Sequence, residues 1–307
     1  MTEKQKLTLD EIENELGKNP QNIKLRILYA EALIEEGFLL DAQDEYKDLI
    51  KAFPEDPEII FNLGVTYEKQ GKFDKALSLY EKAADLAPED PDFRYNVAFM
   101  LDKKGETQKA LQEYKKTIKL NPEDANAHFN IGYLYAQNNQ SDLALEYFKK
   151  AKELNPEDIY ARFDLAFEYK KTGEIDKALD EYLDLVKVCP SYSWAYFNIA
   201  CILHETGDKK RAIEYFHKTV EVNPKDIETF KILSDISPTK TKALEYLKEG
   251  LKHNSKNGEL HYYLSKIYKK MGQLEKQLHH LKKALENEDT LFVNPLLVAK
   301  EIRTCTG

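Results

Sequence analysis

Two side chains in the second half of the chain have the chemistry of a metal site. Cys201 and His204 are three residues apart, which places a thiol and an imidazole on the same side of a helix. A structural zinc site needs four protein ligands and a catalytic site needs three. We therefore interpret Cys201 as a packed thiol and His204 as a groove histidine, and we expect no metal. His279 and His280 are adjacent, so they point apart on a helix and are weaker candidates still.

The common motifs of catalysis and cofactor binding are missing from the sequence. It contains no HExxH, no GxSxG, no phosphate-binding glycine loop and no CxxC pair. Charged residues make up 32% of the chain, so neighbouring carboxylates are expected on a solvated face and do not indicate acid–base catalysis. We expect that the protein is not an enzyme and that it holds no cofactor.

Amide and aromatic side chains recur at a constant interval of 34 residues, as from Asn62 to Asn96. A side-chain amide offers both a donor and an acceptor, so a row of amides can hold an extended peptide backbone. Two apolar columns, mainly aromatic, accompany the amides. The amide column is Asn62, Asn96, Asn130, Asp164 and Asn198; the first apolar column is Phe61, Tyr95, Phe129, Phe163 and Phe197; the second is Val65, Phe99, Tyr133, Phe167 and Cys201.

The same period runs through the residues that begin and end helices. Apolar residues recur with the spacing of an amphipathic helix, so each repeat is predicted to form two helices. A glycine or asparagine tolerates the left-handed backbone that ends the first helix, and a proline followed by acidic residues separates the second helix from the next repeat. The turn column is Gly37, Gly71, Gly105, Asn139, Gly173 and Gly207, and the prolines are Pro20, Pro54, Pro88, Pro122, Pro156, Pro190 and Pro224.

Small and aromatic columns predict close packing of the two helices in each repeat. A small residue on each helix lets the pair approach, and an aromatic ring fills the space beside them. A fixed period of 34 residues is typical of a solenoid. The small residues are Ala30, Gly64, Ala98, Gly132, Ala166 and Ala200 on first helices and Ala42, Ala76, Ala110, Ala144, Ala178 and Ala212 on second helices; the rings are Tyr46, Tyr80, Tyr114, Phe148, Tyr182 and Phe216.

Segments 61–90 and 129–158, FNLGVTYEKQGKFDKALSLYEKAADLAPED and FNIGYLYAQNNQSDLALEYFKKAKELNPED, resemble tetratricopeptide repeats. The family pattern is W-x₂-L-G-x₂-Y…A-x₃-F…P, and most of its columns match along nearly the whole chain. The resemblance implies an all-α fold: a right-handed superhelical solenoid of antiparallel helix pairs, with about eight repeats plus capping helices. The tryptophan of the pattern is replaced here by Ile60, Arg94, His128, Arg162 and Tyr196.

The regularity of the columns divides the chain into four parts. Thr8 and Glu11 have the spacing of a capping box, and Asn294 with Pro295 would open a final helix, so each end is expected to carry a capping helix. The seventh repeat lacks three residues around its turn and contains Pro238, which predicts a tighter connection and a local change of curvature. The parts are 1–22 (N-terminal capping helix), 23–226 (six regular repeats), 227–291 (one shortened and one divergent repeat) and 292–307 (C-terminal capping helix and tail).

In the resembling family the first helices line a concave groove. The candidate peptide-binding residues are therefore the amide column, the first aromatic column, and Phe99, Tyr133 and Phe167 of the second column. The alternative is structural: the amides bridge neighbouring helices and the rings pack between them. Some family members hold the terminal carboxylate of heat-shock chaperones with Lys, Asn and Arg; aromatic and valine residues stand at those positions here, so we do not expect that activity.

Composition limits the partners. The formal net charge is −9, which argues against nucleic acid, and no segment has the length and hydrophobicity of a membrane span or a signal peptide. Three cysteines without framework spacing fit the reducing cytoplasm. We expect a cytoplasmic scaffold that binds a peptide segment or helix of a protein partner. The alternative is a homo-oligomer in which the terminal helix around Leu296, Leu297 and Val298 occupies another molecule's groove.

Overall fold

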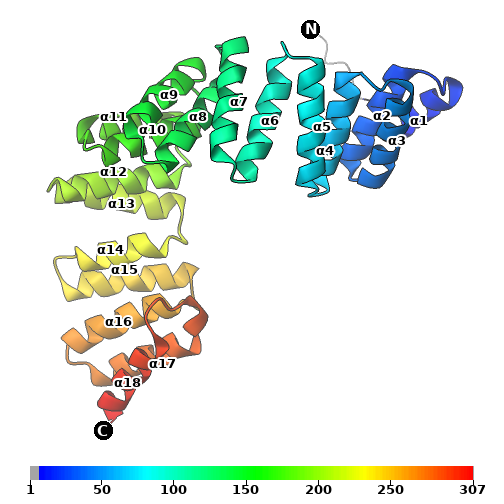
Figure 1. Ribbon diagram of the computed structural model, residues 1–307. Helices are drawn as coiled ribbons and strands as arrows, with labels where there is room; N and C mark the ends of the chain where they lie inside the picture. The colour runs from blue at the N-terminus through cyan, green and yellow to red at the C-terminus, as the bar shows by residue number, and fades with distance from the viewer. Residues whose placement is uncertain (1–6, 307) are drawn as a thin grey trace. The chain divides into compact units, whose positions relative to one another are not determined.

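Helices make up most of the chain in the computed structural model, which describes residues 7–306 (Figure 1). No strand occurs within that range, so the all-α prediction is confirmed. The helices form two compact units, the first ending at Asp164 and the second beginning at Leu165, and the boundary falls inside α10 (Ile159–Lys171). Residues 1–6 of the expected N-terminal cap and residue 307 of the expected tail lie outside the described residues.

The N-terminal unit is a series of helix pairs with short turns (Figure 1). The first helices α4, α6 and α8 each contain 13 residues and begin at equal intervals, at Pro57, Pro91 and Ala125, so the sequence period is the structural period. Its helices are α1 (Leu9–Lys18), α2 (Ile23–Glu36), α3 (Leu39–Ala52), α4 (Pro57–Lys69), α5 (Phe73–Leu86), α6 (Pro91–Lys103), α7 (Thr107–Leu120), α8 (Ala125–Gln137), α9 (Ser141–Leu154) and the first part of α10.

The residues predicted to begin and end the helices have the expected backbone geometry and hydrogen bonds. Asp56 caps α4 by accepting a hydrogen bond from the Ile59 amide at 3.2 Å, and Asp124 caps α8 by accepting one from the Ala127 amide at 2.9 Å. The turn residues have positive φ, including Asn139 at 57°, which is a conformation that glycine and asparagine adopt at low cost. The aspartates after the prolines therefore begin the first helices, as predicted.

The core of each repeat lies where a small residue meets a buried ring. The side chains of Tyr80, Tyr114 and Phe148 are at most 1% exposed. A methyl group on Gly132 would lie 2.8 Å from the ring of Phe148, so this pair of helices is closer than alanine would allow. The predicted packing of small and aromatic columns is confirmed.

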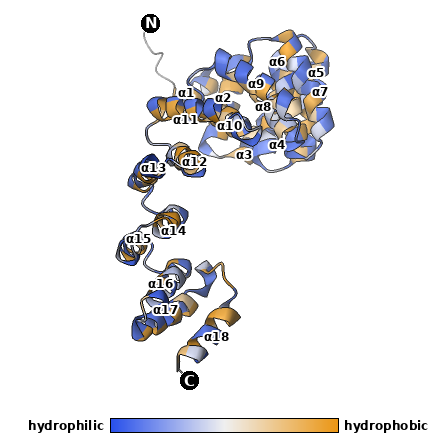
Figure 2. Cartoon of the chain, turned by 90° about the vertical axis from the view of Figure 1, so that its left-hand side faces the viewer, coloured by the Kyte–Doolittle hydropathy of each residue, from blue (hydrophilic) through white to orange (hydrophobic). Residues whose placement is uncertain are grey.

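The C-terminal unit is also built from helix pairs, and its helices carry both hydrophobic and hydrophilic residues (Figure 2). Its final helix packs on α17 through Val298, which is fully buried, and opens where the Asn294 side chain accepts a hydrogen bond from the Leu296 amide at 2.9 Å. Its helices are the rest of α10, α11 (Ile175–Val188), α12 (Ser193–Glu205), α13 (Lys209–Val222), α14 (Ile227–Asp235), α15 (Lys240–His253), α16 (Gly258–Lys270), α17 (Leu274–Glu286), the 3₁₀ helix η1 (Glu288–Thr290) and α18 (Pro295–Thr306).

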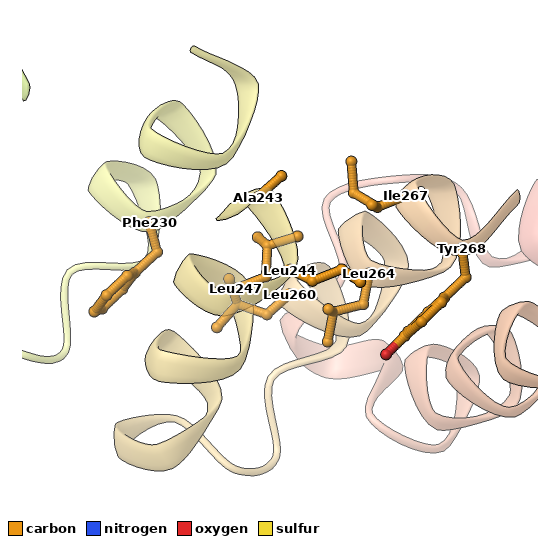
Figure 3. Close-up of a cluster of buried hydrophobic side chains, with 8 residues drawn as sticks. All are labelled: Phe230, Ala243, Leu244, Leu247, Leu260, Leu264, Ile267 and Tyr268. Atoms are coloured by element: carbon orange, nitrogen blue, oxygen red, sulfur yellow. The ribbon is translucent and has the colours of Figure 1, made fainter. Parts of the chain in front are cut away.

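The seventh repeat is shortened in its first helix, not in its turn. Helix α14 has nine residues where α12 has 13, and the connection to α15 spans four residues, 236–239, where α12 and α13 are joined by three. The predicted tighter connection is therefore wrong: Pro238 ends the helix early, because proline is excluded from a helix interior. Packing is kept because Phe230 fits against Gly250 in a cluster with Leu247 and Leu260 (Figure 3).

Candidate peptide-binding surface

The candidate residues lie on the first helices of the pairs, and we call this surface the first-helix face. Its members in the N-terminal unit are carried by α4, α6, α8 and the start of α10, and those in the C-terminal unit by the rest of α10 and by α12. Contacts between adjacent first helices are direct: Lys103 Nζ lies 2.8 Å from Glu68 Oε1, and the Asn130 amide donates to the Tyr95 hydroxyl at 3.0 Å. Side chains one repeat apart therefore form a continuous surface within the N-terminal unit.

The first aromatic column is half-buried because it braces each helix pair. Four rings of this column pack on the buried aromatic residue of the second helix in the same pair. One side of each of these rings therefore packs within the helix pair, and the other side is partly exposed. The ring pairs, with centroid distances, are Phe61–Tyr80 (4.9 Å), Tyr95–Tyr114 (5.5 Å), Phe129–Phe148 (5.8 Å) and Phe197–Phe216 (6.0 Å), and Phe163 is also half-buried.

The second column carries more accessible rings than the first column does. Tyr133 is 42% exposed and Phe167 is 49% exposed, while Phe99 is half-buried. Tyr133 stacks on Phe129 of the same helix with a centroid distance of 6.4 Å, so one face of its ring remains open. Val65 and Cys201, at the ends of the column, are half-buried. Exposed rings at fixed intervals are the kind of anchor that a protein partner buries.

The amide column is half-buried and divides between two uses. Asn130 bridges to Tyr95 of the preceding repeat, as the structural alternative to peptide binding expects. Asn96 and Asn198 instead donate to carbonyls of their own helices, at 2.7 and 2.9 Å. The Oδ1 atoms of Asn96 and Asn198 accept no hydrogen bond from residues 7–306 and so can accept one from a ligand. Asn62 and Asp164 are also half-buried.

Two exposed aromatic residues belong to this surface and were not predicted. Tyr160 in the N-terminal unit and Trp194 in the C-terminal unit are each 61% exposed and stand in the first turn of α10 and α12. Trp194 makes an edge contact with Phe197 at 6.1 Å. The sequence contained a signal for both residues. Their column has polar side chains at Glu58 and Asp92, so an aromatic residue there is a departure, and Trp194 is the single tryptophan of the chain.

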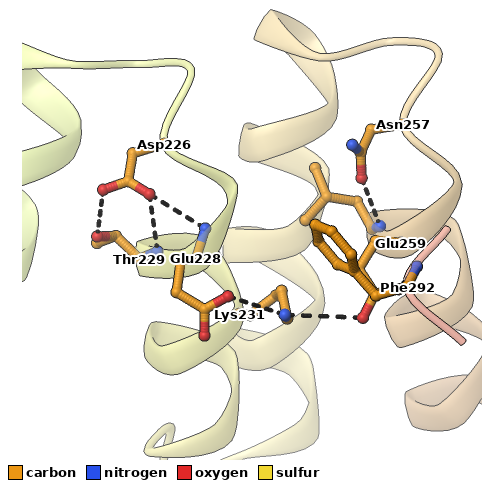
Figure 4. A network of polar contacts seen from close by, with 8 residues as sticks. Asp226, Glu228, Thr229, Lys231, Asn257, Glu259 and Phe292 are labelled. Carbon is orange, nitrogen blue, oxygen red and sulfur yellow. Dashed lines mark hydrogen bonds and ion pairs between the residues drawn. The ribbon is translucent and has the colours of Figure 1, made fainter. Parts of the chain in front are cut away.

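Further along the C-terminal unit the first-helix face becomes polar. Lys231 takes the position of the first aromatic column in α14, where its ammonium lies 2.9 Å from Glu228 and 3.7 Å from the buried Glu259, with Phe292 nearby (Figure 4). Burial lowers the pKa of Lys231, but the hydrogen bond to Glu228 and the neighbouring carboxylates outweigh burial, so the pKa is raised. The ammonium therefore remains charged, and in this column α14 has a paired cation where the preceding first helices have a ring.

The chemistry of a metal or a reactive thiol is not assembled around the predicted candidates. Across residues 7–306 no group of three His, Cys, Asp or Glu side chains could hold a metal ion. Burial raises the pKa of the Cys201 thiol to about 11, which keeps it protonated and unreactive near neutral pH. His280 pairs with His261 of the preceding helix, Nδ1 to Nδ1 at 2.9 Å, an association that the sequence did not indicate.

No helix in the described part of the chain has both the length and the hydrophobicity needed to cross a membrane.

Comparisons with known proteins identify the repeats. Family models described as tetratricopeptide repeat match residues 29–91, 79–112, 125–158, 195–226 and 258–289, and one described as TPR repeat matches residues 100–139. Among curated proteins no match was found.

Solved structures of tetratricopeptide repeat proteins share this fold. The C-terminal part of a TPR repeat-containing protein from Cytophaga hutchinsonii has a TM-score of 0.67 at 21% identity, covering 78% of this chain and 99% of that one. The protein YrrB has a TM-score of 0.54 at 21% identity, covering 61% and 96%, and MamA has 0.52 at 24%, covering 57% and 96%. At these identities the likeness concerns the fold alone.

Proposed function

This chain belongs to the tetratricopeptide repeat family, and on that premise we propose that it is a non-catalytic scaffold that binds a peptide segment or helix of a protein partner along its first-helix face. The observation that carries the proposal is the presence of exposed rings beside amides with unused acceptors. Tyr133 in the N-terminal unit, and Phe167 and Trp194 in the C-terminal unit, are among the most open of these rings. YrrB, which has a similar fold, is described as having an unusual peptide-binding site.

Recognition would combine two kinds of contact. An extended peptide donates backbone N–H groups to the free Oδ1 atom of Asn96 in the N-terminal unit or of Asn198 in the C-terminal unit, and its apolar side chains pack against the rings of the second column. Burial of exposed rings supplies most of the affinity, because aromatic anchors dominate interface energetics. The half-buried first column holds those rings in place by packing on the second helices.

A degenerate dodecapeptide library tests the proposal. The wild-type chain should retain a subset of peptides, and the double variant Tyr133→Ala with Phe167→Ala should bind them at least about tenfold more weakly, because it loses one ring anchor from each unit. The matched control is Leu40→Ala with Leu143→Ala, which removes two exposed apolar side chains from the second helices α3 and α9. Equal binding by wild type and the ring variant, with unchanged helicity, would contradict the first-helix face as the site.

A second candidate function, self-association, is favoured by the exposed apolar side chains at the end of the C-terminal unit. Phe292, Leu296 and Leu297 are 79%, 76% and 54% exposed. If α18 of one molecule packs on another, sedimentation equilibrium should give a mass that rises with concentration, and Leu296→Glu with Leu297→Glu should return it to the monomer value. A monomer mass at all concentrations would reject this function.

The proposed partners are proteins, in a cytoplasmic setting. A net charge of −9 disfavours the phosphate backbone of nucleic acids and the anionic surface of a membrane. The three cysteines are all free thiols, which suits a reducing compartment.

A further inference from the structure

An internal cation site on the N-terminal unit shows what the first-helix face can bind. The ammonium of Lys103 lies 2.8 Å from Glu68 Oε1 and 4.6 Å from the centre of the Phe99 ring. The Tyr80 hydroxyl donates to the other oxygen of Glu68 at 2.8 Å. A carboxylate oriented by a phenol, together with an aromatic face, therefore holds one lysine side chain.

The next repeat has a residue equivalent to each part of this site, with Asp in place of Glu, Tyr in place of Phe and Gln in place of the lysine. Helices α6 and α8 have the same length as α4 and α6 and follow them by one repeat, so each side chain has a defined counterpart. Gln137 stands where the repeat before has its lysine, and its neutral amide cannot balance a carboxylate. The counterparts of Glu68, Phe99, Tyr80 and Lys103 are Asp102, Tyr133, Tyr114 and Gln137.

Two polar groups of this repeat have no side-chain partner within residues 7–306. Asp102 is half-buried and makes no ion pair or side-chain hydrogen bond within residues 7–306, and burial raises the pKa of its carboxyl group. The Tyr114 hydroxyl is completely buried and makes no hydrogen bond there, and the Tyr46 hydroxyl likewise makes none in its own repeat. The nearby Asn130 amide bonds to the Tyr95 hydroxyl. A half-buried carboxylate without a cation is costly, so this position favours a basic group.

Lysines close in the sequence cannot complete the site, because they are engaged elsewhere. Lys103 is held by Glu68, and Lys104 lies 2.5 Å from Asp74. Tyr133, by contrast, is 42% exposed, so its ring is accessible to a ligand.

We propose that a lysine or arginine side chain of the bound peptide fills this position, between the Asp102 carboxylate and the Tyr133 ring. The inference rests on the proposed function and specifies the chemistry of the partner: a segment with one basic residue among apolar ones. The carboxylate supplies the charge, and the ring supplies a cation–π contact.

A positional-scanning dodecapeptide library, in which one position at a time is fixed, tests the inference. Wild type should prefer Lys or Arg over Gln at one position by about tenfold, the effect expected of an ion pair combined with a cation–π contact. Asp102→Asn should lose this preference and keep the apolar ones. Gln137→Lys should lose it as well, because the new ammonium occupies the position from within the chain. Glu89→Gln, which removes the same charge from an exposed turn, should keep it.

The outcomes separate this inference from the function on which it rests. Peptide binding without a basic preference, or with one that Asp102→Asn retains, overturns the cation site and leaves the peptide scaffold intact. Failure to retain any peptide overturns both. A carboxyl NMR titration decides the geometry without any peptide: the pKa of Asp102 should be lower in Gln137→Lys than in wild type, and an unchanged pKa would refute the correspondence with the Glu68–Lys103 pair.

Discussion

The column that holds tryptophan in the family pattern shows how one residue depends on its partner across a helix pair. In this chain the column varies from charged to aromatic. The structure shows that four side chains of the column are each chemically matched to one on the second helix of the same pair. The matched pairs are Arg26 with Glu45, Arg94 with Glu113 (3.5 Å), His128 with Tyr147 (rings 5.8 Å apart) and Tyr196 with Tyr215 (6.4 Å).

A charge-to-apolar exchange tests this matching. Glu113→Leu should destabilise the protein by about 1–3 kcal/mol, because it leaves the half-buried Arg94 guanidinium without its partner. Adding Arg94→Ile places the residue types of the preceding repeat, Ile60 and Leu79, at both positions and should restore the free energy of unfolding to within about 1 kcal/mol of wild type. Urea denaturation of both variants provides the measurement. A double variant no more stable than the single one would show that the positions are independent.

At the scale of the element, the separation of two helices is set by a small residue facing a ring. A Cβ on Gly64 of α4 would lie 2.7 Å from the Tyr80 ring, whereas a Cβ on Gly17 of α1 would meet no atom within 4 Å. The same substitution should therefore have opposite effects at two helical positions.

Gly64→Ala should lower the free energy of unfolding by about 1–2 kcal/mol, because overpacking forces α4 and α5 apart. Gly17→Ala should raise it by up to about 1 kcal/mol, because alanine restricts the unfolded chain and favours the helix. Thermal and urea unfolding of the two variants, compared with wild type, give the signs directly. Stabilisation by Gly64→Ala would mean that the helix pair opens more easily than the contact distances indicate.

The first helix of the chain differs from the second helices of complete repeats in the side chains that it exposes. Thr8 and Glu15 are exposed at positions where α3 buries Ala42 and Leu49. The predicted capping box is present, since Thr8 and Glu11 exchange hydrogen bonds at 2.9 and 3.4 Å. A polar outer surface on α1 supports its proposed role as the N-terminal cap.

At the scale of the whole molecule, stability is local, because each repeat of a solenoid contacts mainly its neighbours. Acid should therefore affect the two units differently. The C-terminal unit contains the buried pair His261 and His280, whose rings share one hydrogen bond at 2.9 Å while His280 stacks on Tyr268. Burial and neighbouring cationic groups, mainly His261 and His279, lower the pKa of His280 to about 4, and the pKa of His261 is also lowered, first by burial.

Because the folded pKa values lie below the ordinary value of about 6.5, the unfolded chain binds more protons in acid. The contribution of this pair to stability is present above pH 6.5 and should be lost as the pH falls towards 4, by up to about 3 kcal/mol. Between pH 7 and 5, the amide protection factors, which are corrected for the intrinsic exchange rate at each pH, should fall in α16 and α17 and change less in α4 to α7. His280→Phe, which keeps the stacking on Tyr268 and cannot titrate, should remove the difference; an equal fall in both variants would contradict this origin.

The sequence by itself determined the period of the array, the turns, the helix caps and the close packing of each pair. These features follow from local rules that recur in each repeat: a left-handed turn residue such as Asn139, an aspartate cap such as Asp56, and a small residue opposite a ring. Local rules can be read without knowing which distant side chains meet.

Only the tertiary structure decided how much of each ring is exposed and which polar groups lack partners. The openness of Tyr133 beside the half-buried Phe129, the pairing of His261 with His280, and the absence of an ion pair for Asp102 among residues 7–306 all depend on side chains that are distant in the sequence. The early end of α14 depends on how the chain resolves a three-residue deletion around Pro238. Such outcomes depend on side-chain length and on packing between helices, which the repeat pattern does not encode.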